Sequence, residues 1–287
     1  MATAIAEPTR LAPFVAAPPR TPMGRALRKL AARRAALTAH NPRQIAVPLV
    51  GPALLALVVA PALKVATGGL NSNIDYTSFV GVGAVGLVVP LSCIFAGLSV
   101  IVDRHSGAQR ELLAAPVPRG FLVLGNLIVA LVLSALQVAV LIGLSAIRGG
   151  EFHVTGSGVA WFAAAALLFT VFMYSLAETL ASKVAKQEDY VGAVPAVAVL
   201  PFFLAGALFP IGAMPGALTA IAKVLPLTHA LALMRYGFVD PKGAGLHDIW
   251  GGGSTIVHAW LSLGVVAFFA AALLAVAIRS FTRSAVH

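Results

Sequence analysis

Residues that could act in catalysis or bind a metal are few in this sequence, and their spacing matches no catalytic or metal-binding motif. The chain holds 10 Asp and Glu, 7 His and 1 Cys among 287 residues. The acids and histidines lack the spacing of metal ligands, and no GxxxxGK[ST] loop is present to bind nucleotide phosphates. Cys93 alone cannot form a disulfide or a cysteine metal site within one chain. The sequence therefore predicts no catalytic, cofactor-binding or metal-ligating residue in this chain.

Polar side chains inside apolar segments are the remaining candidates. Glu178 lies near the end of an apolar run, where it either extends to the membrane–water interface or makes a charge contact or a site for a cationic substrate. Asn126 and Gln137 could line a path or form hydrogen bonds between helices. Arg235 could be an interface anchor or part of a salt bridge that closes an outer gate. The residue types leave both interpretations open in each case.

Composition places these candidates in a membrane protein. The chain is 59% hydrophobic and only 10% charged, with a mean hydropathy of +0.93, whereas soluble domains carry about a quarter charged residues. Runs of about 20 apolar residues are typical of transmembrane helices. We therefore expect an all-α polytopic protein in the cytoplasmic membrane. Six spans are predicted, at about residues 45–66, 77–102, 121–147, 158–181, 190–210 and 256–278.

The N-terminal region divides into two parts. Residues 1–20 are rich in Ala, Pro and Thr and are predicted to be a disordered cytosolic tail. Residues 21–43 place basic side chains around Leu27 and Leu30, which predicts an amphipathic helix on the inner membrane surface, attracted by anionic lipid. The alternative is a nucleic-acid-binding arm, but no aromatic residue accompanies the charges for base stacking. Membrane lipid, and not nucleic acid, is the predicted partner.

A polar break separates the second and third predicted spans. Residues 106–116 predict a short amphipathic helix that begins near Ser106 and Gly107 and stops at Pro116, because proline lacks the amide that a helix needs. Leu112 and Leu113 fall on one side of this helix, and the charged Arg110 and Glu111 are turned away from them. Such a helix is either a docking element or an ordinary interfacial loop.

A second unusual stretch lies between the last two predicted spans. Pro210, Pro215 and Pro226 divide residues 211–236 into two apolar pieces, each too short to cross about 30 Å of hydrocarbon. Non-spanning helices at membrane depth persist only where protein or a water-filled cavity surrounds them. Two short re-entrant helices are therefore predicted. The nearby aromatics Phe202, Phe203 and Phe209 could form an apolar gate, face lipid or pack in the core.

The distribution of Lys and Arg predicts the orientation. With six spans, both termini lie on the same side of the membrane as residues 106–116 and the link that holds Lys183 and Lys186. That side carries about 15 of the 20 basic residues, which the positive-inside rule places in the cytoplasm. The C-terminal residues 280–287 are thus expected to be cytosolic, and the re-entrant helices to enter from outside.

Two motifs resemble those of a known family. The first is SGAQRELLAAPVPRGFLVLG, from Ser106. The second is LPFFLAGALFPIGAMPGALTAIAKVLPLTHALALMRYG, from Leu200, with Pro, Gly, Met-Pro, Pro-Leu-Thr and Met-Arg at matching places. The chain resembles the permease subunit of ABC-2 type transporters, and is similar to the daunorubicin and doxorubicin resistance exporters of actinobacteria. It departs from them at Asp103, where a Glu is usual, and at Ala108, where a hydroxyl residue is usual.

The resemblance implies a domain, partners and roles for residues. Residues 44–279 would form an ABC-2 type transmembrane domain, the permease of an efflux system that confers antibiotic resistance. It would pair with a second permease subunit, as a homodimer or heterodimer, and with a separate ABC ATPase that binds ATP and Mg. Coupling to the ATPase would involve Arg104, Gly107, Arg110, Glu111, Leu112 and Leu113. The outer gate would involve Phe209, Pro210, Met214, Pro215, Pro226 and Arg235.

Three functional hypotheses follow. The first is an exporter of an amphipathic or hydrophobic substrate, because the spans offer few buried charges to hold a hydrophilic one. The second is a proton-coupled secondary transporter with Glu178 as the carrier, although such proteins typically contain repeats and none is visible. The third is a membrane enzyme or scaffold, for which no site chemistry is present.

Overall fold

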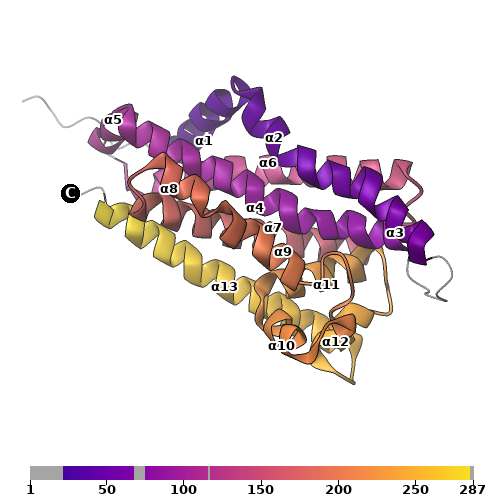
Figure 1. The fold of residues 1–287 in the computed structure, drawn as a ribbon. Coiled ribbons are helices and arrows are strands. Elements are labelled where there is room, and N and C mark those ends of the chain that lie inside the picture. Colours follow the sequence, from indigo (N-terminus) through magenta and orange to yellow (C-terminus); the bar gives the residue numbers. More distant parts are fainter. Residues whose placement is uncertain (1–21, 68–74, 116, 285–287) are drawn as a thin grey trace, which may run out of the picture.

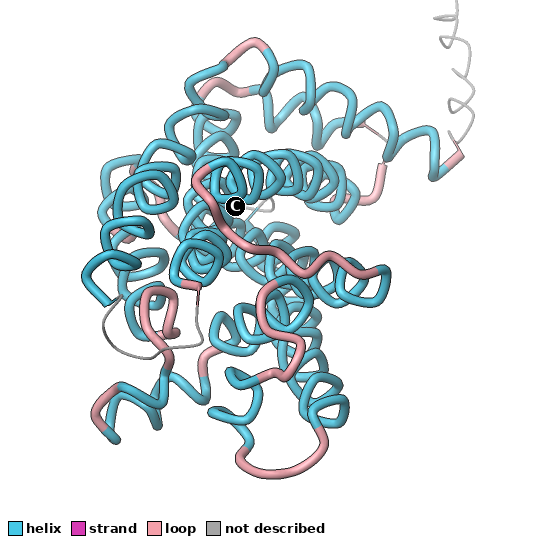
Figure 2. The backbone as a smooth tube through the Cα atoms, turned by 90° about the vertical axis from the view of Figure 1, so that its right-hand side faces the viewer, coloured by secondary structure: helices cyan, strands magenta, loops and turns pink. Residues whose placement is uncertain are grey.

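The computed structural model describes residues 22–67, 75–115 and 117–284. Within these residues every regular element is helical, which confirms the predicted all-α class (Figures 1 and 2). The predicted tail 1–20, the link 68–74, the helix stop at Pro116 and the last three residues lie outside this description. The long helices run side by side, with α5 at one end of the bundle and α10 and α12 at the other (Figure 1).

Five helices are long and apolar enough to cross a membrane, judged over the described residues. The first combines α2 (Pro42–Leu54), the π-helical η1 (Leu55–Val59) and α3 (Ala60–Thr67). Pro48, Pro52 and Pro61 lie within it, as expected for an irregular helix. The other four are α4 (Tyr76–His105), α6 (Gly120–Ile147), α7 (Gly156–Lys183) and α13 (Thr255–Ser284).

The segment predicted as the fifth span is not one of these five helices. It consists of α8 (Gln187–Gly192), η2 (Pro195–Val199) and α9 (Leu200–Leu204), and it ends before the predicted boundary at residue 210. Pro195 and Pro201 remove amides from the helical ladder, which accounts for the irregular path.

Helices α10 (Gly216–Val224) and α11 (Pro226–Phe238) follow the 3-10 turn η3 (Ile211–Ala213) and are bent by 83° from each other. This geometry fits a broken span or a re-entrant pair, so the re-entrant assignment stays a prediction. Short helix α12 (Ala244–Trp250) then leads to α13.

Helix α7 lies at the centre of the bundle, packed against α4, α6, α11 and α13. Its inward face carries Phe169, Tyr174 and Ala177, all completely buried. Helix α1 (Met23–Ala39) packs against α6 and crosses the end of the bundle, as the view along the bundle in Figure 2 shows. Its Arg34 is only 6% exposed. The N-terminal helix is thus part of the packed domain as well as a basic surface.

Candidate functional site

The predicted short helix is present as α5 (Ala108–Ala114), which lies between α4 and α6 in the chain. Gly107 begins it with φ +82°, a left-handed conformation that favours glycine. Ser106 does not cap this helix, although serine is a common capping residue: it ends α4, and its hydroxyl donates to the Asp103 carbonyl. Gly107, and not Ser106, is the residue that directly precedes α5, and no side chain caps the helix.

The two faces of α5 differ as the sequence predicts. Arg110 and Glu111 are exposed, whereas Leu112 and Leu113 are half-buried and pack against the hydrophobic core. The leucines therefore hold α5 to its own chain, and the charged face is the one open to a partner. Whether any of these four residues contacts an ATPase stays a prediction.

Arg104, at the end of α4, makes an internal contact. Its guanidinium donates to the Val184 carbonyl at 2.6 Å, and His105 lies 3.1 Å from the Ala185 carbonyl. These bonds tie the end of α4 to the link after α7. The side chain predicted to contact an ATPase is thus already engaged within the chain.

Arg34 of α1 forms an ion pair that no pattern in the sequence indicates. Its Nη1 lies 3.2 Å from Asp103 Oδ2, and its Nη2 donates to the Ala96 carbonyl at 3.1 Å. The side chains are 7% and 21% exposed. The contact links α1 to α4 four residues before Gly107, at the entrance to α5.

Gln137 joins three spans by hydrogen bonds. Its Oε1 accepts from Ser92 Oγ at 2.5 Å, and its Nε2 donates to the Ile45 carbonyl at 2.9 Å. The side chain is 1% exposed, so a role in helix packing accounts for it fully. Asn126, in the second turn of α6, is half-buried beside a narrow gap under α1.

Glu178 does not extend to the membrane interface, because it is completely buried. Tyr174 Oη lies 2.9 Å from Glu178 Oε2 and 3.2 Å from the Val123 carbonyl. Glu178 Oε1 has no hydrogen-bond partner. Among the described residues no cation lies within 4.0 Å of this carboxylate, and Arg34 pairs with Asp103 instead.

Arg235 of α11 is neither an interface anchor nor part of a salt bridge. It is 9% exposed, and its guanidinium carbon lies 3.4 Å from the centre of the Phe79 ring. Its terminal nitrogens donate to the carbonyls of Gly206, Ala207 and Phe79 at 2.8–3.3 Å. Within the described residues no carboxylate lies within 4.0 Å of it. Arg235 therefore fastens the loop after α9 to α4 and α11.

Gly83 explains how that loop approaches α4 so closely. A Cβ atom at Gly83 would lie 2.1 Å from the Ala207 carbonyl oxygen, so only glycine fits there. Of the predicted gate aromatics, Phe202 is buried, whereas Phe203 and Phe209 are exposed. The three rings do not form one buried gate.

The proline residues of the predicted outer gate set the local path of the chain. Pro215 precedes α10 and Pro226 begins α11, which accounts for the bend between the two helices. Pro210 precedes η3, and the half-buried Met214 ends it.

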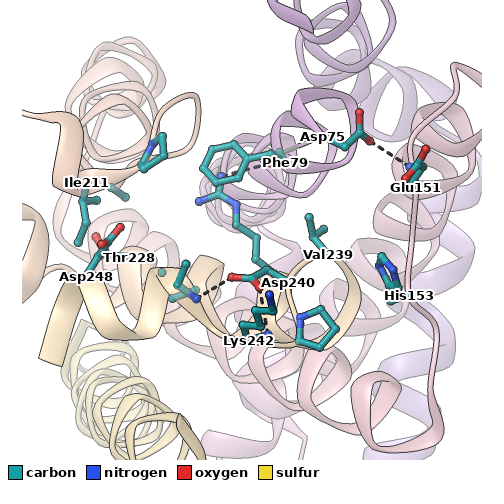
Figure 3. Close-up of a pocket in the computed structure, with 17 residues that line it drawn as sticks. Asp75, Phe79, Glu151, His153, Ile211, Thr228, Val239, Asp240, Lys242 and Asp248 are labelled. Atoms are coloured by element: carbon teal, nitrogen blue, oxygen red, sulfur yellow. Dashed lines mark hydrogen bonds between the residues drawn. The ribbon is translucent and has the colours of Figure 1, made fainter. Parts of the chain in front are cut away.

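A cavity of about 700 Å³ opens beside Arg235 (Figure 3), and it is lined in part by α12, which lies at the end of the bundle opposite α5 (Figure 1). Its charged lining residues come from parts of the chain that are far apart in sequence: Asp75, Glu151, Arg235, Asp240, Lys242 and Asp248. Sequence reasoning missed this group, because no motif joins residues so far apart in the chain.

Asp75 organises one wall of the cavity. It caps α4, accepting from the amides of Ser78 and Thr77, and it also accepts from the Glu151 amide and pairs with Lys64 at 2.9 Å. Partial burial would raise the pKa of Asp75, but the hydrogen bonds from Ser78, Glu151 and Lys64 outweigh it and bring the pKa to about 2. The carboxylate therefore stays ionised.

Comparisons with known proteins agree with the arrangement of these helices. Residues 25–239 match the family described as "ABC-2 type transporter". The chain is 25% identical over 181 residues to nodulation protein J of Sinorhizobium fredii, covering 62% of this chain and 68% of that protein. It is 28% identical over 195 residues to the putative transport permease ycf38 of Porphyra purpurea, covering 64% and 66%. With most of the chain matched, and with a bundle of membrane-spanning helices, this protein belongs to the ABC-2 type transporter family as a membrane permease component.

Proposed function

We propose that this permease exports an amphipathic or hydrophobic substrate across the cytoplasmic membrane, using ATP hydrolysed by a separate ABC ATPase subunit. Two permease subunits would enclose the path, and both termini would lie in the cytoplasm. The observation that supports this proposal best is α5, a short helix with an exposed charged face and an anchored apolar face. It lies at the end of the bundle where the basic residues gather.

The contacts at the start of α5 support this proposed coupling role. Arg104 links the end of α4 to the chain after α7, and Asp103 links it to α1. A push on α5 from an ATPase would thus reach α1, α4 and α7 together. The exposed Arg110 and Glu111 offer one charge of each sign for pairing with a partner.

The proposed substrate class follows from the character of the spans. Among the described residues, the buried charged side chains of the bundle are Arg34, Glu178 and Arg235, and all three are hydrogen-bonded within the chain. Charges inside a membrane are unfavourable unless they are paired. A hydrophilic ion would find few partners on this path, which favours a lipid-like or amphipathic molecule.

The second candidate is a proton-coupled transporter that uses Glu178. The buried carboxyl group with its unpartnered Oε1 favours this candidate. Its complete burial opposes it, because a proton carrier needs access to water from at least one side.

Vesicles that contain the permease and its proposed ABC ATPase partner distinguish the two candidates. A fluorescent lipid analogue serves as the transported probe. We expect transport to require ATP, to continue without a pH gradient, and to survive Glu178→Gln, since a neutral amide can keep the bond to Tyr174. An ATPase variant without its nucleotide-binding lysine is the control. Transport that needs the pH gradient and is lost in Glu178→Gln would favour the second candidate.

A further inference from the structure

We infer that three histidines, His229, His247 and His258, form a latch that holds the short helix α12 in place while they are neutral and releases it when they bind protons from outside the cell. The inference rests on the proposed function for the orientation of the bundle, which places this end outside. Helix α12 packs against α11 and α13 and lies at the end of the bundle opposite α5 (Figure 1). The three side chains belong to α11, α12 and α13.

His229 joins four helices through one ring. It is 2% exposed. Its Nε2 lies 3.0 Å from the Lys223 carbonyl oxygen, at the end of α10, and its Nδ1 lies 3.1 Å from Ser262 Oγ of α13. Trp250 of α12 donates from Nε1 to the same Ser262 Oγ at 2.8 Å, and the centres of the Trp250 and His229 rings are 5.5 Å apart. One buried imidazole thus connects α10, α11, α12 and α13.

The hydrogen-bond partners determine where a neutral His229 carries its proton. A carbonyl oxygen can only accept, so Nε2 donates to Lys223, and Nδ1 then accepts from the Ser262 hydroxyl. The Ser262 oxygen at the same time accepts from Trp250. A second proton on the ring would occupy Nδ1, which could no longer accept, and the Ser262 hydroxyl would have to turn away. The network therefore fits the neutral imidazole and not the imidazolium.

A second pair of rings fastens α12 to the start of α13. His247 of α12 lies 3.1 Å through Nδ1 from the Gly251 carbonyl oxygen and 3.0 Å through Nε2 from Thr255 Oγ1 of α13. The His258 ring packs edge-on against the His247 ring, with the two centres 5.2 Å apart. His258 is 7% exposed, and its Nδ1 has no hydrogen-bond partner. Two positive rings at this distance would repel each other, so protonation disfavours the contact between α12 and α13.

No acid compensates a proton on these rings. Within the part of the chain that the structure describes, no carboxylate lies within 4.0 Å of a nitrogen of the three histidines. The charged side chains of α4, α7 and α13 lie in the last two turns of those helices, away from this end. The other titratable groups around α10, α11 and α12 are of both signs: Asp75, Glu151, His153, Lys223, Arg235, Asp240, Lys242 and Asp248.

Acid should therefore open the latch. Histidine gains its proton between about pH 8 and pH 5, and a buried charge without a counter-ion favours a conformation in which the ring reaches water. Helix α12 can move with little loss of packing, because it has 7 residues and buries only Leu246 and Ile249. Its release would also free the bend between α10 and α11, where His229 holds the Lys223 carbonyl. Acid outside the cell would thus loosen the outer end of the permease and slow export.

The experiment measures hydrogen–deuterium exchange in the full-length permease in lipid nanodiscs, without the ATPase. The exchange of α12 is divided by that of α5, which also has 7 residues, so that the effect of pH on the exchange chemistry cancels. We expect this ratio to rise about tenfold between about pH 7.5 and about pH 5.5, where histidine gains its proton. Ser262→Ala should raise the ratio already at the higher pH, because it removes the hydroxyl that His229 and Trp250 share.

The deciding variant is His229→Gln, His247→Gln. Glutamine can still donate to the carbonyls that these rings contact but cannot be protonated, so most of the pH response should disappear. The matched control His40→Gln replaces the exposed histidine that follows α1, and it should keep the response.

A ratio that does not change with pH in the parent, a full response in the double variant, or a lost response in the control would each overturn the inference. ATP-driven transport by a permease whose α12 ignores pH would overturn this inference alone. An α12 that opens in acid, in a permease without ATP-driven transport, would overturn only the proposed function.

Discussion

Arg34 and Asp103 form an ion pair that joins the N-terminal helix to the last turn of α4. The two side chains are separated by 69 positions in the sequence and by 3.2 Å in the fold. Asp103 lies just before the Ser106–Gly107 turn that leads into α5. The N-terminal helix therefore supports the turn from which α5 begins, in addition to carrying several basic side chains.

Removing one member of this pair should destabilise the permease. Asp103→Ala leaves a nearly buried guanidinium without its counter-ion, and we expect a loss of roughly 3 kcal/mol, since breaking a buried pair is strongly unfavourable. Thermal unfolding of the purified permease measures it. A double-mutant cycle with Arg34→Ala tests the coupling, and strictly additive effects would show that the pair contributes nothing.

Gly107→Ala tests the left-handed turn before α5. The substitution forces a Cβ into a conformation with φ +82°, which costs about 1–2 kcal/mol. Because the strain falls where α5 leaves α4, permease-stimulated ATP hydrolysis should fall more than thermal stability. Gly143→Ala is the matched control, since it lies in α6 with no atom within 4 Å of the added group. Equal ATP hydrolysis in both variants would contradict this role.

Asp75 gives a prediction that depends on pH. Its pKa in the folded protein, about 2, lies below the ordinary Asp value of about 4, so the ionised form stabilises the fold. This contribution is complete above about pH 4 and is lost as the pH falls toward 2. Asp75→Asn should therefore lower the melting temperature at pH 7, and the difference from the parent should shrink below pH 4. A difference that grows on acidification would contradict the assignment.

The path of residues 211–236 can be tested by labelling. In a Cys93→Ser background, Gly216→Cys and Gly252→Cys both add a side chain into open space. A re-entrant pair entering from outside predicts that a membrane-impermeant maleimide labels both cysteines in intact cells. Labelling of Gly216→Cys only after the cells are opened would mean that the segment crosses the membrane.

Local patterns predict the long helices and α5 because these features depend on neighbouring residues. Runs of apolar residues define the spans, and Gly107 with its flanking residues defines the start of α5. The sequence predicts a span at residues 190–210, because hydropathy does not register the backbone amides that prolines lack. In the structure the chain up to Leu204 forms the irregular segment α8–η2–α9, where Pro195 and Pro201 interrupt the helical hydrogen bonds.

Contacts between distant residues could not be predicted from the sequence. Arg33 and Arg34 are adjacent residues of the same type, and nothing in the sequence distinguishes them. Arg33 is exposed, whereas the packing of α1 on α6 buries Arg34. Arg235 is held by backbone carbonyls, and every residue type presents the same carbonyl group. The cavity acids come from segments that only the fold brings together.

The most direct test is ATP hydrolysis by the reconstituted complex of the permease and its proposed ABC ATPase partner, measured with the charges on α5 reversed. The double substitution Arg110→Glu, Glu111→Arg changes only the exposed face of that helix. The control Arg148→Glu changes an exposed charge at the opposite end of the bundle. We expect the α5 variant to fold normally but no longer to co-purify with the ATPase. Its stimulated rate of ATP hydrolysis should fall at least tenfold, which corresponds to a loss of about 1.4 kcal/mol or more of binding free energy. Unchanged co-purification and hydrolysis in the α5 variant would contradict it.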